Sequence, residues 1–280
     1  MVNDSSDIVM NKSKAHLLLL YLLKRLNEIT EEANIPYYAS GGTCLGAIRH
    51  NGFIPWDDDI DVMIPRKYYN DFVEICKKRL KSPVTIRTRE NDPFFCCEYI
   101  KLCFRDDIIG YSDLSIDVSF LDETNPRRKL FRALQNFLLT QLYYLKVYKL
   151  GRLGLGKLYK PNSLLRHSWL WFWSFFFSLP KIDQWNRVIM LAEKNNGDYW
   201  INWGSCYHYS KATYSKKALG IPKKVPFEDT YVYAAEHTEE ILQHLYGSDY
   251  MSLPPPEKRT EHMVREIHCS ELYAKGILKE

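Results

Sequence analysis

The sequence predicts an α/β (α+β) fold in which helices flank a sheet, with a basic, aromatic-rich helical insertion. Three observations support this prediction. Residues 12–33 repeat apolar side chains with the period of a helix, several later segments alternate apolar and polar side chains with the period of a strand, and residues 127–182 contain eleven basic residues and no acidic one. At 280 residues, 46% of them hydrophobic, the chain can bury a sizeable core.

The expected elements alternate along the first 121 residues. Helices are expected at Lys12–Ala33, Thr43–His50 and Arg66–Leu80, and strands at Tyr37–Ser40, Asp59–Ile64, Val84–Thr88, Cys97–Phe104 and Ser115–Leu121. Later, helices are expected at Gln184–Lys194 and Thr238–Tyr246, with a short strand or loop at Trp200–Tyr209. We expect a core of residues 1–125, an insertion of residues 126–199, and a C-terminal part, residues 200–280, that completes the core.

A run of aspartates leads into the second expected strand. In the sequence DDDIDVMI, residues 57–64, Asp59 and Asp61 are two positions apart and therefore share one face of a strand. Two carboxylates at this spacing repel each other unless they share a proton or a cation lies between them. Such oxygen ligands suit Mg²⁺ (or Mn²⁺), which completes its coordination shell with substrate phosphates. The motif therefore predicts a divalent-cation site.

A glycine pair precedes this motif. Gly41 and Gly42 follow the first expected strand, and Thr43 begins the next helix. Glycine lets backbone N–H groups approach a phosphate, and the start of a helix favours an anion. Alone, a glycine pair is ordinarily a turn and an aspartate run a solvated loop. Together, the two motifs favour phosphate binding beside a metal-binding pair.

Four further residues are candidates for the same site. Asp117 lies in the middle of an expected strand, where a carboxylate is costly unless it has a partner or takes part in chemistry. It is therefore a candidate third acid. Arg49, Lys101 and Arg105 are candidates for binding substrate phosphates; the alternative is that they are ordinary surface charges.

The cysteines and the net charge limit other functions. Seven cysteines are scattered along the chain, an odd number that argues against a disulfide framework. Cys96, Cys97 and Cys103 could supply three zinc ligands, but no fourth follows at a zinc-finger spacing. The net charge of only +4 argues against a nucleic-acid partner. No signal peptide or spanning segment is recognised, so a cytoplasmic location is expected.

The insertion has the most unusual composition. Its basic residues are interleaved with aromatic ones, and residues 169–177 read WLWFWSFFF. Tryptophan and phenylalanine beside cationic residues suit the interface of a membrane with anionic lipids. The alternatives are an aromatic helix buried on the core and, with less support, a nucleic-acid surface.

Three segments together resemble the LicD family, to which fukutin-related proteins are also similar. They are GGTCLGAIRHNGFIPWDDDIDVMIPRKYYNDF at 41–72, SIDVSFLD at 115–122 and LYGSDYMSLPPPEKRTEH at 245–262. The resemblance covers about residues 10–121 and 200–268 and is weaker between them. Ser119 departs from the family pattern, which has FPLD where this chain has SFLD; this affects the expected local backbone, not the acid.

The resemblance implies a nucleotidyltransferase-like mixed sheet and a phosphotransferase. Such enzymes move phosphocholine or a phospho-polyol from a CDP-activated donor to a sugar hydroxyl of a lipid-linked or surface glycan (teichoic acid, lipopolysaccharide or capsule) and release CMP. By this pattern Asp59 and Asp61 hold magnesium, Asp117 is either a further ligand or the base, and the donor phosphates lie along Gly41, Gly42 and Thr43. Two other readings stay open: transfer of a nucleoside monophosphate to a small molecule, and a non-catalytic adaptor. The expected place of action is the inner face of the cell membrane, with peripheral attachment.

Overall fold

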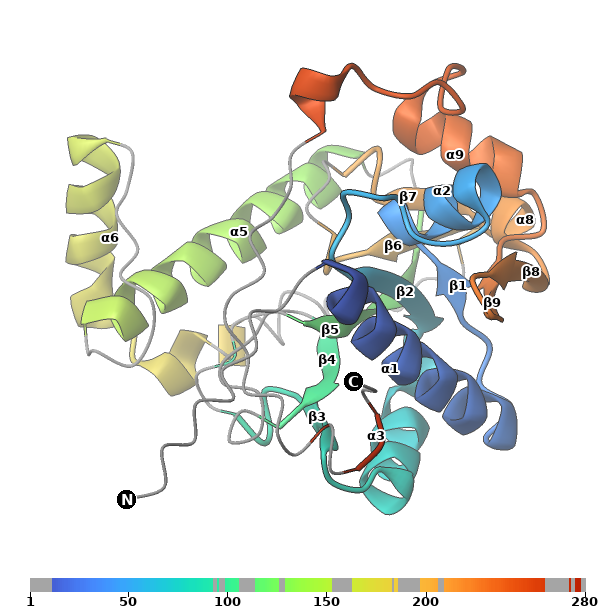
Figure 1. Cartoon of the computed structure of the whole chain (residues 1–280). Coiled ribbons are helices and arrows are strands. Elements are labelled where there is room, and N and C mark those ends of the chain that lie inside the picture. Colours follow the sequence, from blue (N-terminus) through green and yellow to red (C-terminus); the bar gives the residue numbers. More distant parts are fainter. Residues whose placement is uncertain are drawn as a thin grey trace, which may run out of the picture. The chain divides into compact units, whose positions relative to one another are not determined.

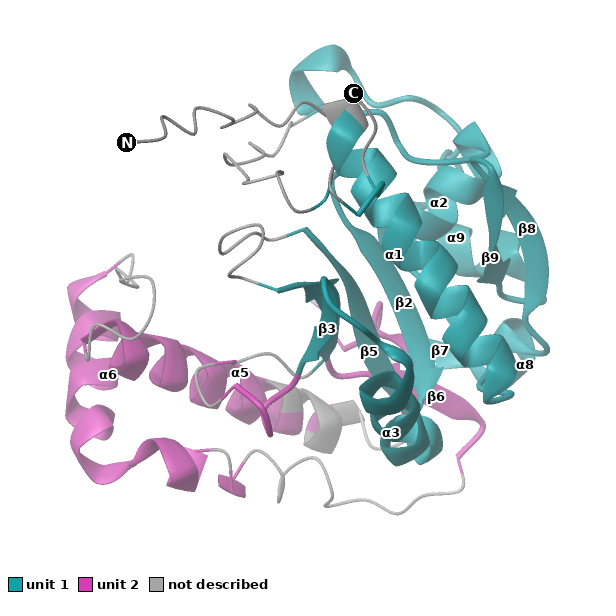
Figure 2. Cartoon of the chain, turned by 60° about the horizontal axis from the view of Figure 1, so that its bottom comes forward, with its two compact units in different colours: residues 1–87, 99–121, 214–280 teal, residues 88–98, 122–213 magenta. Residues whose placement is uncertain are grey.

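The computed structural model describes residues 12–92, 95, 99–105, 114–125, 129–152, 163–182, 184–185, 197–205, 209–259, 272 and 275–277. The chain forms two compact units (Figure 2). Unit 1 comprises residues 1–87, 99–121 and 214–280, and unit 2 comprises residues 88–98 and 122–213. All nine candidate site residues belong to unit 1, and the expected insertion falls within unit 2.

A mixed sheet confirms the predicted α/β fold (Figure 1). Its strands are β1 (Tyr38–Ala39), β2 (Ile60–Pro65), β3 (Val84–Arg87), β4 (Ile100–Phe104), β5 (Ser115–Thr124), β6 (Tyr199–Asn202) and β7 (Thr213–Ser215). Among the described residues the order is β1-β2-β5-β4-β3, with β6 paired with β5 and β7. Strands β2 and β5 run parallel, whereas the β1–β2, β3–β4 and β4–β5 pairs are antiparallel.

Helices flank the sheet in unit 1. They are α1 (Lys12–Glu32), α2 (Gly41–His50), α3 (Tyr69–Arg79), α8 (Lys216–Leu219) and α9 (Thr238–Tyr246), with short 3₁₀ turns at Arg66–Tyr68 and Pro256–Lys258. The leucines of α1 at positions 18, 19, 22, 23 and 26 are fully buried and share one core with the strands. In β2, residues 62–65 are all buried, as expected of a strand covered on both faces. The core thus fixes the position of the strand that carries the aspartate motif.

The structure corrects several details of the predicted elements. Helix α2 begins at Gly41 instead of Thr43, and α3 spans Tyr69–Arg79 instead of Arg66–Leu80. Strand β2 begins at Ile60, so Asp59 lies in the irregular segment just before it and only Asp61 of this pair is within the strand. The antiparallel hairpin of β8 (Lys223–Phe227) and β9 (Thr230–Ala234) was not predicted. Its two-residue turn is Glu228-Asp229, with Glu228 at φ +52°, and lacks the Asn-Gly or Asp-Gly pair that signals such hairpins.

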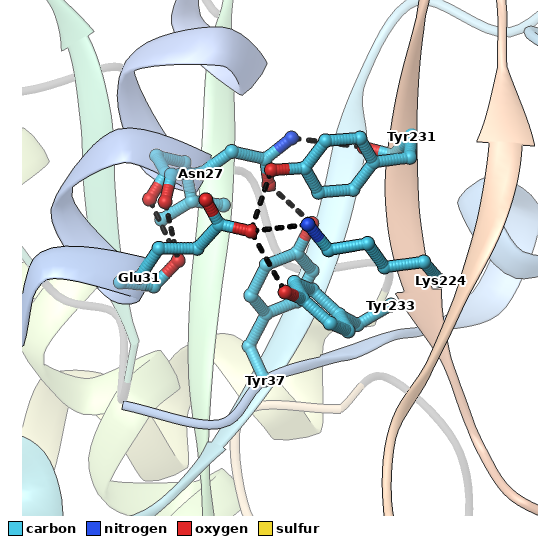
Figure 3. Close-up of polar contacts among 8 residues, drawn as sticks. Asn27, Glu31, Tyr37, Lys224, Tyr231 and Tyr233 are labelled. Carbon is cyan, nitrogen blue, oxygen red and sulfur yellow. Dashed lines mark hydrogen bonds and ion pairs between the residues drawn. The ribbon is translucent and has the colours of Figure 1, made fainter. Parts of the chain in front are cut away.

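A polar cluster joins this hairpin to α1 (Figure 3). The Nζ of Lys224 lies 2.6 Å from Oε1 of Glu31, and the hydroxyls of Tyr231 and Tyr233 donate to the same oxygen at 2.7 and 2.9 Å. The Lys224 ammonium also lies 4.1 Å from the centroid of the Tyr231 ring. These contacts, led by the one with Lys224, lower the pKa of Glu31 to about 2. The cluster therefore fastens a C-terminal hairpin to an N-terminal helix.

We expect Glu31→Gln to lower the free energy of unfolding at pH 7 by ~1 kcal/mol, a small value because the cluster is solvent-exposed. Since the folded-state pKa of Glu31 is depressed below its unfolded value, the contribution is present above about pH 4.5 and declines as the pH falls towards 2. Urea unfolding of both proteins at pH 7 and pH 3 would measure it. A difference in stability that did not shrink at pH 3 would contradict the assignment.

Unit 2 contains two long helices, α5 (Lys129–Arg152) and α6 (Leu164–Phe176). They pack together around Leu145, Tyr148, Leu170 and Ile182, all of them buried. None of the described helices is long and apolar enough to cross a bilayer. Several expectations lie outside the described residues: the zinc candidates Cys96 and Cys97, and most of the helix expected at residues 184–194.

Candidate active site

The glycine turn is fastened to the start of β2. The Ser40 N–H donates to the carbonyl of Asp61 at 2.9 Å, and the Asp61 N–H donates to the buried Thr43 hydroxyl at 2.8 Å. Gly41, between them, has φ +52°, a conformation that favours glycine. A Cβ at Gly41 would lie 3.4 Å from Asp61 Oδ2. The turn and this carboxylate are thus held together as one unit.

Asp57 lies against the second glycine. A Cβ at Gly42 would come within 2.2 Å of Asp57 Oδ2, so a larger residue at position 42 would displace this carboxylate. The Asp57 carbonyl contacts His16 Nε2 at 2.8 Å, and its N–H donates to Ile54 at 2.9 Å. The first aspartate of the motif is therefore positioned by α1 and by a local turn.

Strand register brings Asp61, Asp117 and Lys101 side by side. Asp61 is paired with Asp117 across the parallel β2–β5 ladder, and Asp117 is paired with Lys101 across the antiparallel β5–β4 ladder. Register partners on adjacent strands project from the same face of a sheet. The Nζ of Lys101 lies 3.1 Å from Asp117 Oδ1 and donates to Ser115 Oγ at 2.9 Å. The Ser115 hydroxyl in turn donates to Asp117 Oδ1 at 2.8 Å.

The electrostatics of the cluster show an excess of negative charge. Burial, then repulsion from Asp57, Asp117 and Asp58, raises the pKa of Asp59 to about 7. Burial, then repulsion from Asp59, Asp117 and Asp57, raises the pKa of Asp61 well above its ordinary value. Lys101 opposes both shifts. One lysine does not neutralise this group of carboxylates, so binding of a cation or protons is favourable.

The donor set fits a hard divalent cation. Among the described residues, Asp57, Asp58 and Asp59 each offer a ligand atom, and these atoms lie within 4.8 Å of one another. The predicted metal set, Asp59, Asp61 and Asp117, shares only Asp59 with this group and stays a prediction. Asp57 and Asp58 were not predicted as ligands because they precede the strand. The run of three aspartates was the available signal, but only the folded turn brings their carboxylates together.

The other predicted phosphate ligands lie in different surroundings. Nη1 of Arg49 donates to the carbonyls of Tyr250 and Ser252 at 3.0 and 3.2 Å, and so fastens α2 to the segment after α9. Arg105 is exposed just beyond β4. It is four residues beyond Lys101, which corresponds to about 13 Å along an extended chain. Lys101 is thus the predicted cation that the structure places against the acids.

The C-terminal motif borders the same site. The Tyr246 hydroxyl lies 3.8 Å from where a Cβ at Gly41 would be. The Arg259 guanidinium lies 5.1 Å from the centroid of the ring of Trp56, the residue directly before the aspartate run. Arg259 Nε donates to the Pro254 carbonyl at 2.9 Å. The sequence did not predict a role for Tyr246 or Arg259. Both lie in the motif at 245–262 that resembles the family, and this resemblance was the available signal that the segment belongs with the core.

Comparisons with known proteins agree with the predicted resemblance. The family model described as LicD/FKTN/FKRP, nucleotidyltransferase domain, matches residues 34–94. The chain is 41% identical over 75 residues to the lipopolysaccharide cholinephosphotransferase LicD of Haemophilus influenzae, covering 27% of this chain and 28% of that protein. It is 31% identical over 156 residues to an uncharacterized protein of Rickettsia typhi, and this match covers 56% of this chain and 47% of that protein. It is 47% identical over 51 residues to an uncharacterized protein of Rickettsia prowazekii, and this match covers 18% of this chain and 19% of that protein. The matches therefore span less than half the length of each relative.

Proposed function

We propose that the chain is a transferase of the LicD type that moves phosphocholine or a phospho-polyol from a CDP-linked donor to a sugar hydroxyl of a cell-surface glycan, with release of CMP. The H. influenzae relative is named for cholinephosphate transfer in lipopolysaccharide. The observation that carries the proposal is the arrangement of Asp59, Asp61 and Asp117 around the start of β2, beside the glycine turn.

The glycine turn is suited to hold the donor diphosphate. Because Gly41 and Gly42 have no side chains, a phosphate could approach the backbone N–H groups at the start of α2 once the Asp57 carboxylate beside Gly42 turns to a metal ion. Thr43 acts indirectly in this proposal: its hydroxyl accepts the Asp61 N–H and so sets the distance between the turn and the carboxylates. The diphosphate would thus lie between the start of α2 and the acids of β2.

A Mg²⁺ or Mn²⁺ ion held by Asp59 and Asp61, with Asp57 and Asp58 as further oxygen donors, would neutralise charge on the donor phosphates. Burial and, after it, repulsion between the carboxylates raise the pKa values of Asp59 and Asp61. The raised values support this assignment, because a cation would relieve the repulsion.

Asp117 is held by a cation and a hydroxyl. Lys101 and Ser115 both contact its Oδ1 atom. Its Oδ2 atom is thus the one that can approach a metal ion or the acceptor hydroxyl, and both roles fit the proposal. Because Lys101 holds this carboxylate as an ion pair, Lys101 also fixes its orientation.

Lys101→Met tests this role. We expect an about tenfold loss of CMP release and a shift of the acidic limb of the pH–rate profile to higher pH, because Lys101 opposes the upward pKa shifts of Asp59 and Asp61. Lys101→Arg, which keeps the charge, should retain the wild-type profile. An unchanged profile in the methionine variant would show that Lys101 does not influence the reacting groups.

The overall function is tested by a screen of CDP-choline, CDP-ribitol and CDP-glycerol for CMP release, with a crude lipid-linked glycan extract as acceptor. The proposal expects one donor to release CMP only when the acceptor and Mg²⁺ are present. A nucleotidylated product would instead support transfer of a nucleoside monophosphate, and absence of any Mg²⁺-dependent nucleotide binding would support a non-catalytic adaptor. Lipid-linked acceptors would place the reaction at the inner face of the cell membrane.

A further inference from the structure

Helix α6 exposes a continuous aromatic surface. Trp169, Trp171, Phe172, Phe175 and Phe176 are each 47–64% exposed, and Leu164 and Leu165, in the first turn of the helix, are 87% and 86% exposed. At 100° per residue these seven side chains and Ser168 occupy an arc of about 160° around the helix. We call this arc the α6 stripe.

The opposite face of α6 is already used. Leu170 is 1% exposed and packs with Leu145, Tyr148 and Ile182 of unit 2. Trp173 and Phe177 are partly buried against the same cluster. The α6 stripe is therefore separate from the face of α6 that packs against α5. The exposed aromatic residues of the stripe are not needed for this packing.

Basic side chains lie beside α6. Lys149 Nζ donates to the carbonyls of Ser174 and Phe177 at 2.7 and 2.8 Å, and Arg152 Nη1 donates to Ser174 Oγ at 3.3 Å. The Arg166 guanidinium stacks 4.1 Å from the centroid of the Tyr144 ring. These partners are uncharged, and residues 127–182 contain no aspartate or glutamate. Of these three cations, Arg152 also contacts the stripe, because its guanidinium lies 6.0 Å from the centroid of the Phe175 ring. The segment itself supplies no acidic residue that would offset this positive charge.

We infer that the α6 stripe is a membrane-binding surface that lies in the interface of a bilayer containing anionic lipids. Tryptophan and phenylalanine favour the headgroup region, and a helix with one apolar face binds parallel to the bilayer without crossing it. The lysines and arginines of residues 127–182, a segment without acidic residues, add attraction to anionic headgroups. This inference is independent of the donor and acceptor of the proposed reaction.

Vesicle flotation of the full chain tests the inference, with phosphatidylcholine vesicles compared with phosphatidylcholine–phosphatidylglycerol vesicles. We expect flotation with the anionic vesicles that weakens as salt is raised. The triple variant Trp171→Ser/Phe172→Ser/Phe175→Ser should lose at least about tenfold in partitioning while keeping its melting temperature, because these side chains are exposed. Lys181→Gln, at an exposed position of the same segment, should lose about fivefold on anionic vesicles and little on neutral ones.

Ile221→Ser/Leu253→Ser provides the matched control. Both residues are exposed and apolar, at 75% and 54%, but lie in unit 1. This variant should float like the wild type. The inference is overturned if the wild type fails to float, if the triple variant floats as well as the wild type, or if sedimentation shows that the stripe instead pairs two copies of the chain. None of these outcomes depends on CMP release, so they are distinguishable from a failure of the proposed reaction.

Discussion

Replacement of Asp59 or Asp61 by asparagine should abolish transfer and, at the same time, stabilise the metal-free protein. Loss of one metal-binding carboxylate should lower CMP release by about a thousandfold or more. The fold should gain stability because each of these carboxylates is buried among others that repel it. We expect the free energy of unfolding of Asp59→Asn to rise by ~1–2 kcal/mol at pH 7 in the presence of a chelator, a value reduced from the full pKa shift because neighbouring charges readjust.

The stability gain should depend on pH in a defined direction. Burial and repulsion raise the folded-state pKa of Asp59 from 3.8 to about 7, so between these values the folded protein binds more protons than the unfolded chain. Wild-type stability therefore falls as the pH rises through this window. Asp59→Asn lacks this titration, so its advantage should be absent near pH 4 and complete near pH 7. Asp71→Asn, at an exposed position in the first turn of α3, is the matched control: it should leave turnover unchanged and lower the free energy of unfolding by at most ~1 kcal/mol, the opposite sign to Asp59→Asn. A less stable Asp59→Asn protein at pH 7 would contradict the repulsion described here.

Gly41→Ala should impair catalysis far more than it impairs folding. The residue has φ +52°, so alanine there costs ~1 kcal/mol in backbone strain. The added methyl group would also lie 3.4 Å from Asp61 Oδ2, within the space proposed for the donor phosphates. We expect CMP release to fall by about a hundredfold, because small displacements at a reacting centre have large kinetic effects.

Gly276→Ala separates the two contributions. Gly276 has φ +66°, but no atom lies within 4 Å of the position of its Cβ. Both alanine variants should therefore lose a similar amount of unfolding free energy, and Gly41→Ala alone should lose activity. Equal activities in the two variants, measured as CMP release at saturating donor, would show that the Gly41 turn is not part of the site.

The sequence predicted the elements whose patterns are local. The period of apolar residues located α1 and α9 to within a residue or so, since an amphipathic helix needs only its own sequence to be recognised. The alternation in SIDVSFL located β5, although the strand extends to Thr124. The prediction that Asp61 and Asp117 belong to one site came from two motifs that resemble one family, and the number of residues between them could not give it. Register between strands far apart in sequence is a property of the folded sheet.

The parts that escaped prediction depend on contacts between distant segments. Nothing near Arg49 indicates that it will bind the carbonyl of Tyr250, two hundred residues later. The position of Asp57 over Gly42 depends on a turn that His16 of α1 supports. The β8–β9 hairpin is held to α1 by Glu31 and Lys224, and its turn carries no recognised signal. In each case a long-range contact, not a local propensity, decides the structure.

The central claim is that the carboxylates at the start of β2 bind a divalent cation. Titration with Mn²⁺, followed by electron paramagnetic resonance with and without CDP, measures this binding without any assumption about the acceptor. We expect wild-type protein to bind Mn²⁺ and to bind it more tightly when CDP is present, and Asp59→Asn and Asp61→Asn to lose this binding while remaining folded. If both variants bound Mn²⁺ as tightly as the wild type, the carboxylates would not be the metal ligands and the proposed chemistry would be contradicted.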